Sequence, residues 1–278
     1  MGGATMDCTT IDVAAVERKG LSRPGSSKTL PRIAQIKLVS QHPEVYEPCD
    51  DSFALVDALL ADRANLLLHQ PTLCLEIGSG SGYVITSLAI MLGSETPTAH
   101  FFATDINPHA VETTRKTLEA HGVHAEIIVS DIASGLQKRL KGMMDVVVVN
   151  PPYVPTPEEE VGQEGITASW AGGENGRRVI DRILPIADEL LSEKGWLYMV
   201  TLTENNPSEI CQLMREKGYG SRIIVQRSTE EERLHVIKFW REKGDEGKEG
   251  SKFGGSGVGS WLSQLPLLSF LRNNGSSN

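Results

Sequence analysis

Short apolar runs alternate along most of the chain with longer segments in which apolar residues recur at helical spacing. Runs rich in β-branched and aromatic residues predict strands at 72–77, 100–106, 124–132, 145–150, 195–202, 221–227 and 233–240. Helical spacing predicts helices around 53–60, 83–92, 108–121, 177–192 and 207–217. The first of these helices has Asp51 or Ser52 as its expected N-cap.

The alternation of strands and helices predicts the architecture. Single helices between successive strands require right-handed crossovers, so we expect an α/β fold with a mostly parallel sheet covered on both faces. Only about five residues separate the last two strands, which is too few for a crossover helix. We therefore predict a Rossmann-like sheet of seven strands that ends in an antiparallel hairpin.

The two ends of the chain differ from its middle in composition. Residues 1–30 lack apolar periodicity and predict a flexible tail, whereas 31–242 carry the predicted domain. Residues 243–278 begin as a Gly/Ser-rich linker and end in a short apolar stretch with Pro266 at its centre. That stretch is either a docking or membrane-surface peptide or a weakly ordered tail, and the proline favours the second interpretation.

Composition and charge exclude several classes of protein. The 278 residues are 40% hydrophobic and carry a formal charge of −9, so we expect no basic face for stable DNA binding. The four cysteines form no C-x-x-C pair, and the seven histidines form no cluster with ligand spacing, so we predict no metal site. No apolar run approaches the roughly 18 residues of a membrane span. We expect a soluble protein of the cytoplasm, with the nucleus as a second compartment.

Three glycines separate the first strand from the following helix. Gly78, Gly80 and Gly82 lie in "EIGSGSG", where missing Cβ atoms allow a tight turn and a close approach to a ligand. Free N–H groups at the start of the helix favour polar or anionic ligand atoms. A glycine turn of this kind can also be purely structural. Whether it indicates a ligand-binding site depends on the residues that follow the neighbouring strands.

Acidic residues follow those neighbouring strands. Asp105 ends the second strand and is placed to accept hydrogen bonds from ribose hydroxyls. Glu76 can face the cationic end of a ligand, and Asp131 can reach an adenine amine or cap a helix. The G-x-G-x-G spacing differs from the G-x-G-x-x-G of nicotinamide-binding folds. With the terminal hairpin, it favours S-adenosylmethionine and a class I methyltransferase fold.

The stretch "DVVVVNPPYVPT" combines a buried strand with an unusual polar end. Four valines predict a central strand that delivers Asn150 to the ligand-binding edge of the sheet. The Asn150 side-chain carbonyl and the Pro151 backbone carbonyl can accept both hydrogens of one planar –NH2 group. Pro152 stiffens the loop, and Tyr153 is expected to stack on the planar group. These four residues are the predicted catalytic group.

Together, "EIGSGSG", "TDIN", "NPPY" and "WAGGENGRRVIDR" resemble the HemK-type glutamine methyltransferases, in particular the eukaryotic and archaeal branch that modifies class I peptide-chain release factors. The similarity covers about residues 40 to 241. It implies methylation of the glutamine in the Gly-Gly-Gln loop of the release factor. It also implies a small zinc-binding activator subunit as partner in a heterodimer, and the apolar strand at 124–132 is the expected exposed edge that such a partner would cover.

The resemblance also assigns further site residues. The implied cofactor contacts are Glu47, Pro48, Asp51, Ser52, Ser79, Ile106 and Ile132, in addition to Asn150. Trp170 and Arg177 are implied at the rim of the substrate entrance, where they would contact the substrate with Asn150, Pro151 and Tyr153.

Three other functions remain open at this stage. A nucleic-acid adenine methyltransferase shares the amine geometry, although the charge of −9 disfavours it. A methyltransferase acting on histone lysine would have to deprotonate an ammonium group before attack, so its rate would rise with pH. A non-catalytic cofactor-binding scaffold is disfavoured by the intact "NPPY".

Overall fold

The computed structural model describes residues 33–93, 95–163, 165–228 and 233–242. The tails predicted at 1–30 and 243–278, including the apolar stretch around Pro266, lie outside the described residues. No helix in the described part of the chain is long and apolar enough to cross a membrane.

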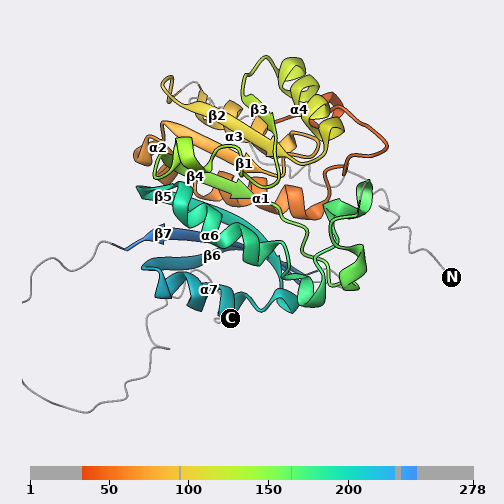
Figure 1. Cartoon of the computed structure of the whole chain (residues 1–278). Helices are drawn as coiled ribbons and strands as arrows, with labels where there is room; N and C mark the ends of the chain where they lie inside the picture. Colours follow the sequence, from red (N-terminus) through yellow and green to blue (C-terminus); the bar gives the residue numbers. More distant parts are fainter. Residues whose placement is uncertain (1–32, 94, 164, 229–232, 243–278) are drawn as a thin grey trace, which may run out of the picture. The chain divides into compact units, whose positions relative to one another are not determined.

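Seven strands form one sheet, as the sequence predicted (Figure 1). Their order across the sheet is β3-β2-β1-β4-β5-β7-β6. Strands β1 to β5 are parallel, and β7 pairs antiparallel with both β5 and β6, which confirms the terminal hairpin. The strand bounds are β1 Leu73–Ile77, β2 His100–Asp105, β3 Glu126–Val129, β4 Met144–Val149, β5 Leu191–Leu202, β6 Tyr219–Ser228 and β7 Arg233–Arg241.

Helices cover both faces of this sheet. In Figure 1, α6 and α7 lie in front of the sheet, whereas α1 and α3 lie behind it. The α-helices are α1 Asp50–Ala61, α2 Arg63–His69, α3 Tyr83–Gly93, α4 Pro108–His121, α5 Gln137–Leu140, α6 Ile180–Leu190 and α7 Pro207–Glu216. Short 3-10 helices are η2 Ile36–Leu38, η3 Glu158–Glu160, η4 Ile166–Ser169, η5 Glu174–Gly176 and η6 Thr203–Asn205.

The start of α1 differs from the prediction. Cys49 occupies the N-cap position and its side chain makes no capping hydrogen bond, whereas Asp51 and Ser52 lie buried inside the first turn. The expected N-cap was therefore wrong. The Asp51 side chain points instead toward Asn150 and Tyr153, which lie far away in the sequence.

Strand β4 is the most deeply buried strand near the site. All six of its residues are buried, because β1 and β5 flank it and helices cover both of its faces. The chain leaves this strand at Asn150, so the valine run fixes where the polar loop begins. Buried parallel strands of this kind present ligand-binding residues at their carboxyl ends.

Candidate active site

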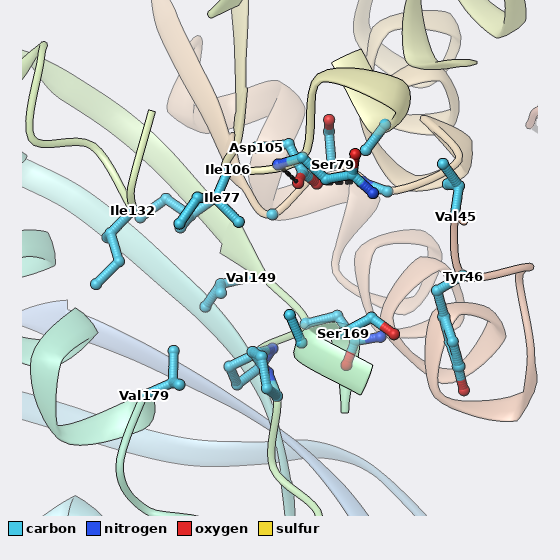
Figure 2. Close-up of a pocket in the computed structure, with 18 of the residues that line it drawn as sticks. Val45, Tyr46, Ile77, Ser79, Asp105, Ile106, Ile132, Val149, Ser169 and Val179 are labelled. Carbon is cyan, nitrogen blue, oxygen red and sulfur yellow. Dashed lines mark hydrogen bonds between the residues drawn. The ribbon is translucent and has the colours of Figure 1, made fainter. Parts of the chain in front are cut away.

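A cavity of about 580 Å³ opens at the carboxyl ends of β1, β2 and β4. This volume lies within the range of small-molecule and cofactor sites. Figure 2 shows Ile106 and Ile132 near Asp105 on one side and Val45 and Tyr46 on the other. The wall is formed by residues that follow β1, β2, β3 and β4, by the segment before α1, and by parts of 161–183.

The glycine loop takes the conformation that its sequence predicted. Gly78, Gly80 and Gly82 have φ angles of 75°, 50° and 80°, in the left-handed region where side chains cause strain. A Cβ atom on Gly82 would lie 2.8 Å from the Cα atom of Thr114 in α4. Gly82 therefore allows α4 to approach the loop, and Ser79 is buried beneath it and lines the cavity.

Asp105 lies beside this loop and lines the cavity. One carboxylate oxygen accepts a hydrogen bond from the Gly80 N–H at 2.8 Å, and the other accepts from the Asn107 N–H at 2.9 Å. Burial raises the pKa of Asp105, although these N–H donors act in the opposite direction. The acid is thus held at the loop by backbone donors. Its contact with ribose hydroxyls stays a prediction.

Glu76 also lines the cavity, but part of its carboxylate is used by the protein itself. One oxygen accepts from the Ile85 N–H in the first turn of α3 at 2.8 Å. Burial raises the pKa of Glu76 well above its ordinary value, and the nearby Asp105 charge acts in the same direction. A carboxyl group in this position stabilises the start of α3, a role that the sequence did not predict.

Asp131 lines the cavity with an ion-pair partner that the sequence did not reveal. Its carboxylate lies 2.5 Å from the Arg182 guanidinium, which reaches the same wall from α6. No helix begins at Asp131, because α5 has Leu136 at its N-cap. The capping alternative was therefore wrong, whereas contact with an adenine amine stays a prediction.

The Asn150 side chain is held in one orientation. Its Nδ2 donates a hydrogen bond to Asp51 Oδ2 at 2.9 Å, and the Tyr153 hydroxyl donates to the same oxygen at 2.9 Å. The other polar atom of the Asn150 side chain is the carbonyl oxygen Oδ1. It is buried and has no hydrogen-bond partner among the described residues. Asn150 lines the cavity together with Pro151 and Pro152, so this acceptor without a partner belongs to a residue of the wall.

Tyr153 and Asp51 have different positions from those expected. Tyr153 is 8% exposed, packs in the hydrophobic core and is not part of the cavity wall, so stacking on a substrate is not the role this geometry supports. Asp51 lies behind Asn150 and is likewise absent from the wall, whereas its neighbour Ser52 lines it. The carboxylate of Asp51 instead joins the two ends of the "NPPY" stretch.

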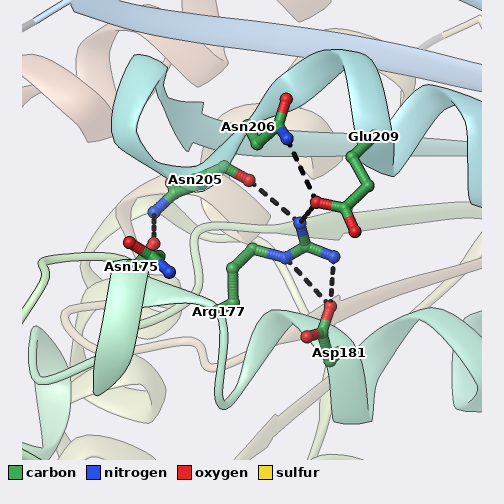
Figure 3. A network of polar contacts seen from close by, with 6 residues as sticks. All are labelled: Asn175, Arg177, Asp181, Asn205, Asn206 and Glu209. Carbon is green, nitrogen blue, oxygen red and sulfur yellow. Dashed lines mark hydrogen bonds and ion pairs between the residues drawn. The ribbon is translucent and has the colours of Figure 1, made fainter.

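The two residues predicted at the substrate entrance do not line the cavity. The Arg177 side chain is 11% exposed and binds Asp181, Glu209 and the backbone carbonyl of Asn205 (Figure 3). It therefore ties the loop before α6 to the start of α7. Trp170 is half-buried, and its carbonyl accepts from the Val154 N–H. The wall is instead formed by the neighbours Ser169 and Ala171.

The segment before α1 lines the cavity through residues other than those expected. Glu47 is exposed, and neither Glu47 nor Pro48 belongs to the wall. Val45 and Tyr46 take that place, and the Glu44 carbonyl accepts from Asn107 Nδ2 at 2.7 Å. Val45 is buried and Tyr46 half-buried, and the apolar pair in the sequence was the signal that could have indicated this.

Three potential metal ligands meet near this segment, contrary to the expectation of scattered histidines. Ligand atoms of His42, Glu44 and His109 lie within 4.8 Å of one another. The two imidazole rings are stacked at 4.4 Å with an angle of 13° between their planes. Ring lone pairs lie in the ring plane, so these nearly parallel rings do not point at one common ion. The sequence did not reveal this cluster because His109 lies in α4, far along the chain from His42 and Glu44.

Comparison with known proteins agrees with this geometry. The model of the methyltransferase small domain family matches residues 52–227. A mouse protein named methyltransferase HEMK2 is 47% identical over 196 residues, which cover 70% of this chain and 89% of the mouse protein. The eRF1 methyltransferase catalytic subunit mtq2 of Schizosaccharomyces pombe is 31% identical over 224 residues, covering 76% of this chain and 95% of the yeast protein.

A solved structure of a methyltransferase complex is also similar to this chain. The Mtq2-Trm112 complex of E. cuniculi, described as responsible for methylation of the eRF1 translation termination factor, contains a chain 28% identical to this one. The TM-score is 0.51, and the match covers 72% of this chain and 99% of that chain. The chain belongs to the methyltransferase small domain family and, within it, to the eukaryotic branch of the HemK-type glutamine methyltransferases.

Proposed function

We propose that this chain transfers a methyl group from S-adenosylmethionine to the side-chain amide nitrogen of the glutamine in the Gly-Gly-Gln loop of a class I release factor. The observation that carries this proposal is the buried, unpartnered Oδ1 atom of Asn150, held at a cavity beside the glycine loop. The names of the mouse, yeast and E. cuniculi relatives support the same reaction.

The residues of the cavity fit S-adenosylmethionine. Asp105 offers carboxylate oxygens suited to ribose hydroxyls, and Ile106, which is 61% exposed, offers an apolar surface suited to a purine ring. Ile132 lies on the same wall and has a φ of 53°, an unusual angle for a β-branched residue. Backbone strain of this kind is concentrated at binding sites. Gly80 leaves room for a ligand to approach the loop.

Asn150 and Pro151 would position the substrate. The amide nitrogen of glutamine is a poor nucleophile because its lone pair is delocalised into the carbonyl group. Two acceptors that fix both N–H bonds favour a pyramidal nitrogen and direct its lone pair along one axis. Bound S-adenosylmethionine supplies an electrophilic methyl group on a sulfonium. The amide proton can leave after the new bond forms, so the site requires no strong general base.

We also propose that an activator subunit pairs with the edge strand β3. This strand ends the sheet, and Val129 is 55% exposed there. Unpaired backbone groups and an exposed apolar side chain on an edge strand favour pairing with another chain. The related E. cuniculi protein was solved as a complex with Trm112, which fits this arrangement. Zinc binding by the partner remains an expectation from the family resemblance.

The partner proposal can be tested by pull-down of the co-expressed activator subunit. Val129→Asp should weaken the association at least about tenfold, because it places a charge on the apolar edge. Met143→Asp is the matched control, since Met143 is 46% exposed and lies outside β3. Equal retention of the partner by both variants would place the interface elsewhere.

The enzymatic proposal is tested by transfer of labelled methyl from S-adenosylmethionine to purified release factor, with the chain and the activator co-expressed. Label should appear on the factor and disappear when the loop glutamine is changed. Asn150→Ala should lower the rate by about 100- to 1000-fold, the usual loss for a preorganised group at the reacting atoms. Asn65→Ala, which alters an amide bonded to Asp62 outside the cavity, should leave the rate unchanged.

Other results would change the assignment. An unlabelled factor with intact cofactor binding would refute the glutamine substrate. Label on histone tails with a rate that rises strongly with pH would indicate lysine instead. Salt-dependent labelling of DNA or RNA would indicate an adenine amine.

A further inference from the structure

Asp51 has an unusual environment for a carboxylate. The residue is 4% exposed, and no cationic side chain among the described residues forms an ion pair with it. Its hydrogen bonds come from the Ser52 N–H and hydroxyl, the Asn150 amide and the Tyr153 hydroxyl. All four of these groups act as donors, which is the pattern that suits an ionised carboxylate.

Helix α1 further stabilises the negative charge of Asp51. Asp51 lies in the first turn of the 12-residue helix α1, where N–H groups and the helix dipole favour negative charge. A negative charge without a neutralising side chain is thus held in the interior. Burial of a charge without an ionic partner is costly, which points to a role beyond folding.

We propose that Asp51 is a positioning residue for methyl transfer, acting through Asn150. It fixes which side of the Asn150 amide faces the cavity, because a carboxylate oxygen can only accept and therefore selects Nδ2. It also places a negative charge behind that amide. A charged acceptor strengthens the bond and polarises the Asn150 carbonyl, which makes Oδ1 a better acceptor for the substrate N–H.

This inference rests on the proposed function. The charge that develops during the reaction explains how Asp51 would act. The glutamine nitrogen bonds to the methyl carbon as the carbon–sulfur bond breaks, and the sulfur leaves as a neutral thioether. The nitrogen carries the positive charge until one of its protons passes to water. Its N–H donors therefore become stronger during transfer, and Asp51 behind the acceptor stabilises the transition state more than the ground state.

Four other acids line the cavity, and none of them has a hydrogen bond to Asn150 among the described residues. Glu76 bonds to the start of α3, and Asp105 bonds to the glycine loop and Asn107. Asp131 pairs with Arg182, and Glu44 pairs with His109. Among the described residues, the Asn150 amide donates to Asp51. The orientation and polarisation of the Asn150 amide are therefore assigned to Asp51.

The test compares three variants of the co-expressed complex. Asp51→Asn keeps the size of the side chain and removes its charge, and should lower kcat by about 10- to 100-fold while KM for the release factor changes by no more than about threefold. Tyr153→Phe removes one donor and leaves the charge, so its kcat should fall several-fold less than that of Asp51→Asn. Asp57→Asn, on the same helix and paired with Arg227, is the matched control and should match the wild type.

A second readout does not depend on the cofactor. The side-chain NH2 signals of Asn150, followed by NMR, should be slow to exchange in wild type and in Tyr153→Phe and should exchange faster in Asp51→Asn. Equal kcat and exchange in wild type and Asp51→Asn would overturn the inference. Equal losses in Asp51→Asn and Tyr153→Phe would show that Asp51 only anchors the loop. An inactive wild type would refute the proposed function, whereas the NMR result would still decide whether Asp51 orients Asn150.

Discussion

Replacing Asn205 by Ala should cause a large loss of stability, because this side chain joins three segments around the site. Asn205 is fully buried in η6. Its Oδ1 accepts from the Leu202 N–H at 2.6 Å, and its Nδ2 donates to the carbonyls of Tyr153 at 2.8 Å and Asn175 at 2.9 Å. The substitution removes all three of these hydrogen bonds.

The expected magnitude follows from these three bonds. A typical internal hydrogen bond contributes about 1 kcal/mol, and a buried group left without a partner costs about 1–3 kcal/mol. Three such bonds, with part of the cost of the groups that bonded to Asn205, give an expected loss of about 3–5 kcal/mol in the free energy of unfolding. For a domain of this size, each kcal/mol lowers Tm by roughly 2–4 °C, so the expected fall is about 10 °C.

Thermal unfolding followed by circular dichroism measures this loss. Asn206→Gly is the control, because Asn206 has a φ of 53°, where glycine causes no strain. Among the described residues, its side chain makes only an exposed hydrogen bond to Glu209, and glycine keeps its backbone hydrogen bonds. This control should change stability by less than about 0.5 kcal/mol. If Asn205→Ala costs less than about 1 kcal/mol, the three bonds do not hold the segments together and the reasoning is refuted.

Three further predictions concern the cavity and the glycine loop beside it. The raised pKa of Glu76 gives stability that is complete below the ordinary carboxyl pKa and lost as pH rises through the raised value, so Glu76→Gln should gain Tm relative to wild type as pH increases. Gly82→Ala should cost several kcal/mol in chemical denaturation because its Cβ would meet Thr114, whereas Gly93→Ala, with open space, should be neutral or slightly stabilising. Asp105→Asn should weaken S-adenosylmethionine binding about tenfold in calorimetry, and unchanged affinity would remove Asp105 from the proposed cofactor site.

Most of the fold could be predicted because its signals are local. Each predicted strand overlaps an observed one, and the short connection before Arg233 correctly indicated a hairpin. The predicted start of α1 was wrong for a physical reason. Asp51 is a good N-cap residue by type, but a tertiary contact with Asn150 places it inside the helix, and such contacts override local preference.

The candidate site was predictable where a residue's role depends on its place at a strand end. Gly78, Gly80, Asp105 and Asn150 line the cavity, because parallel strands bring their carboxyl ends to one edge. Roles that depend on contacts between distant elements were not predictable. The ion pair of Asp131 with Arg182 and the structural network of Arg177 require knowledge of how α6 packs.

The difference between Asn150 and Asp51 shows how the two kinds of information combine. An asparagine after a buried strand supplies an acceptor, but either end of its amide can face the cavity, so the sequence alone leaves its chemistry open. A carboxylate 2.9 Å from Nδ2 removes that freedom and leaves Oδ1 as the unpartnered atom. Helix α1 therefore belongs to the catalytic apparatus although it lies outside the strand-end loops. A site that binds a planar –NH2 group through two acceptors needs this fixed orientation, because a flipped amide would present a donor to the substrate's own donors.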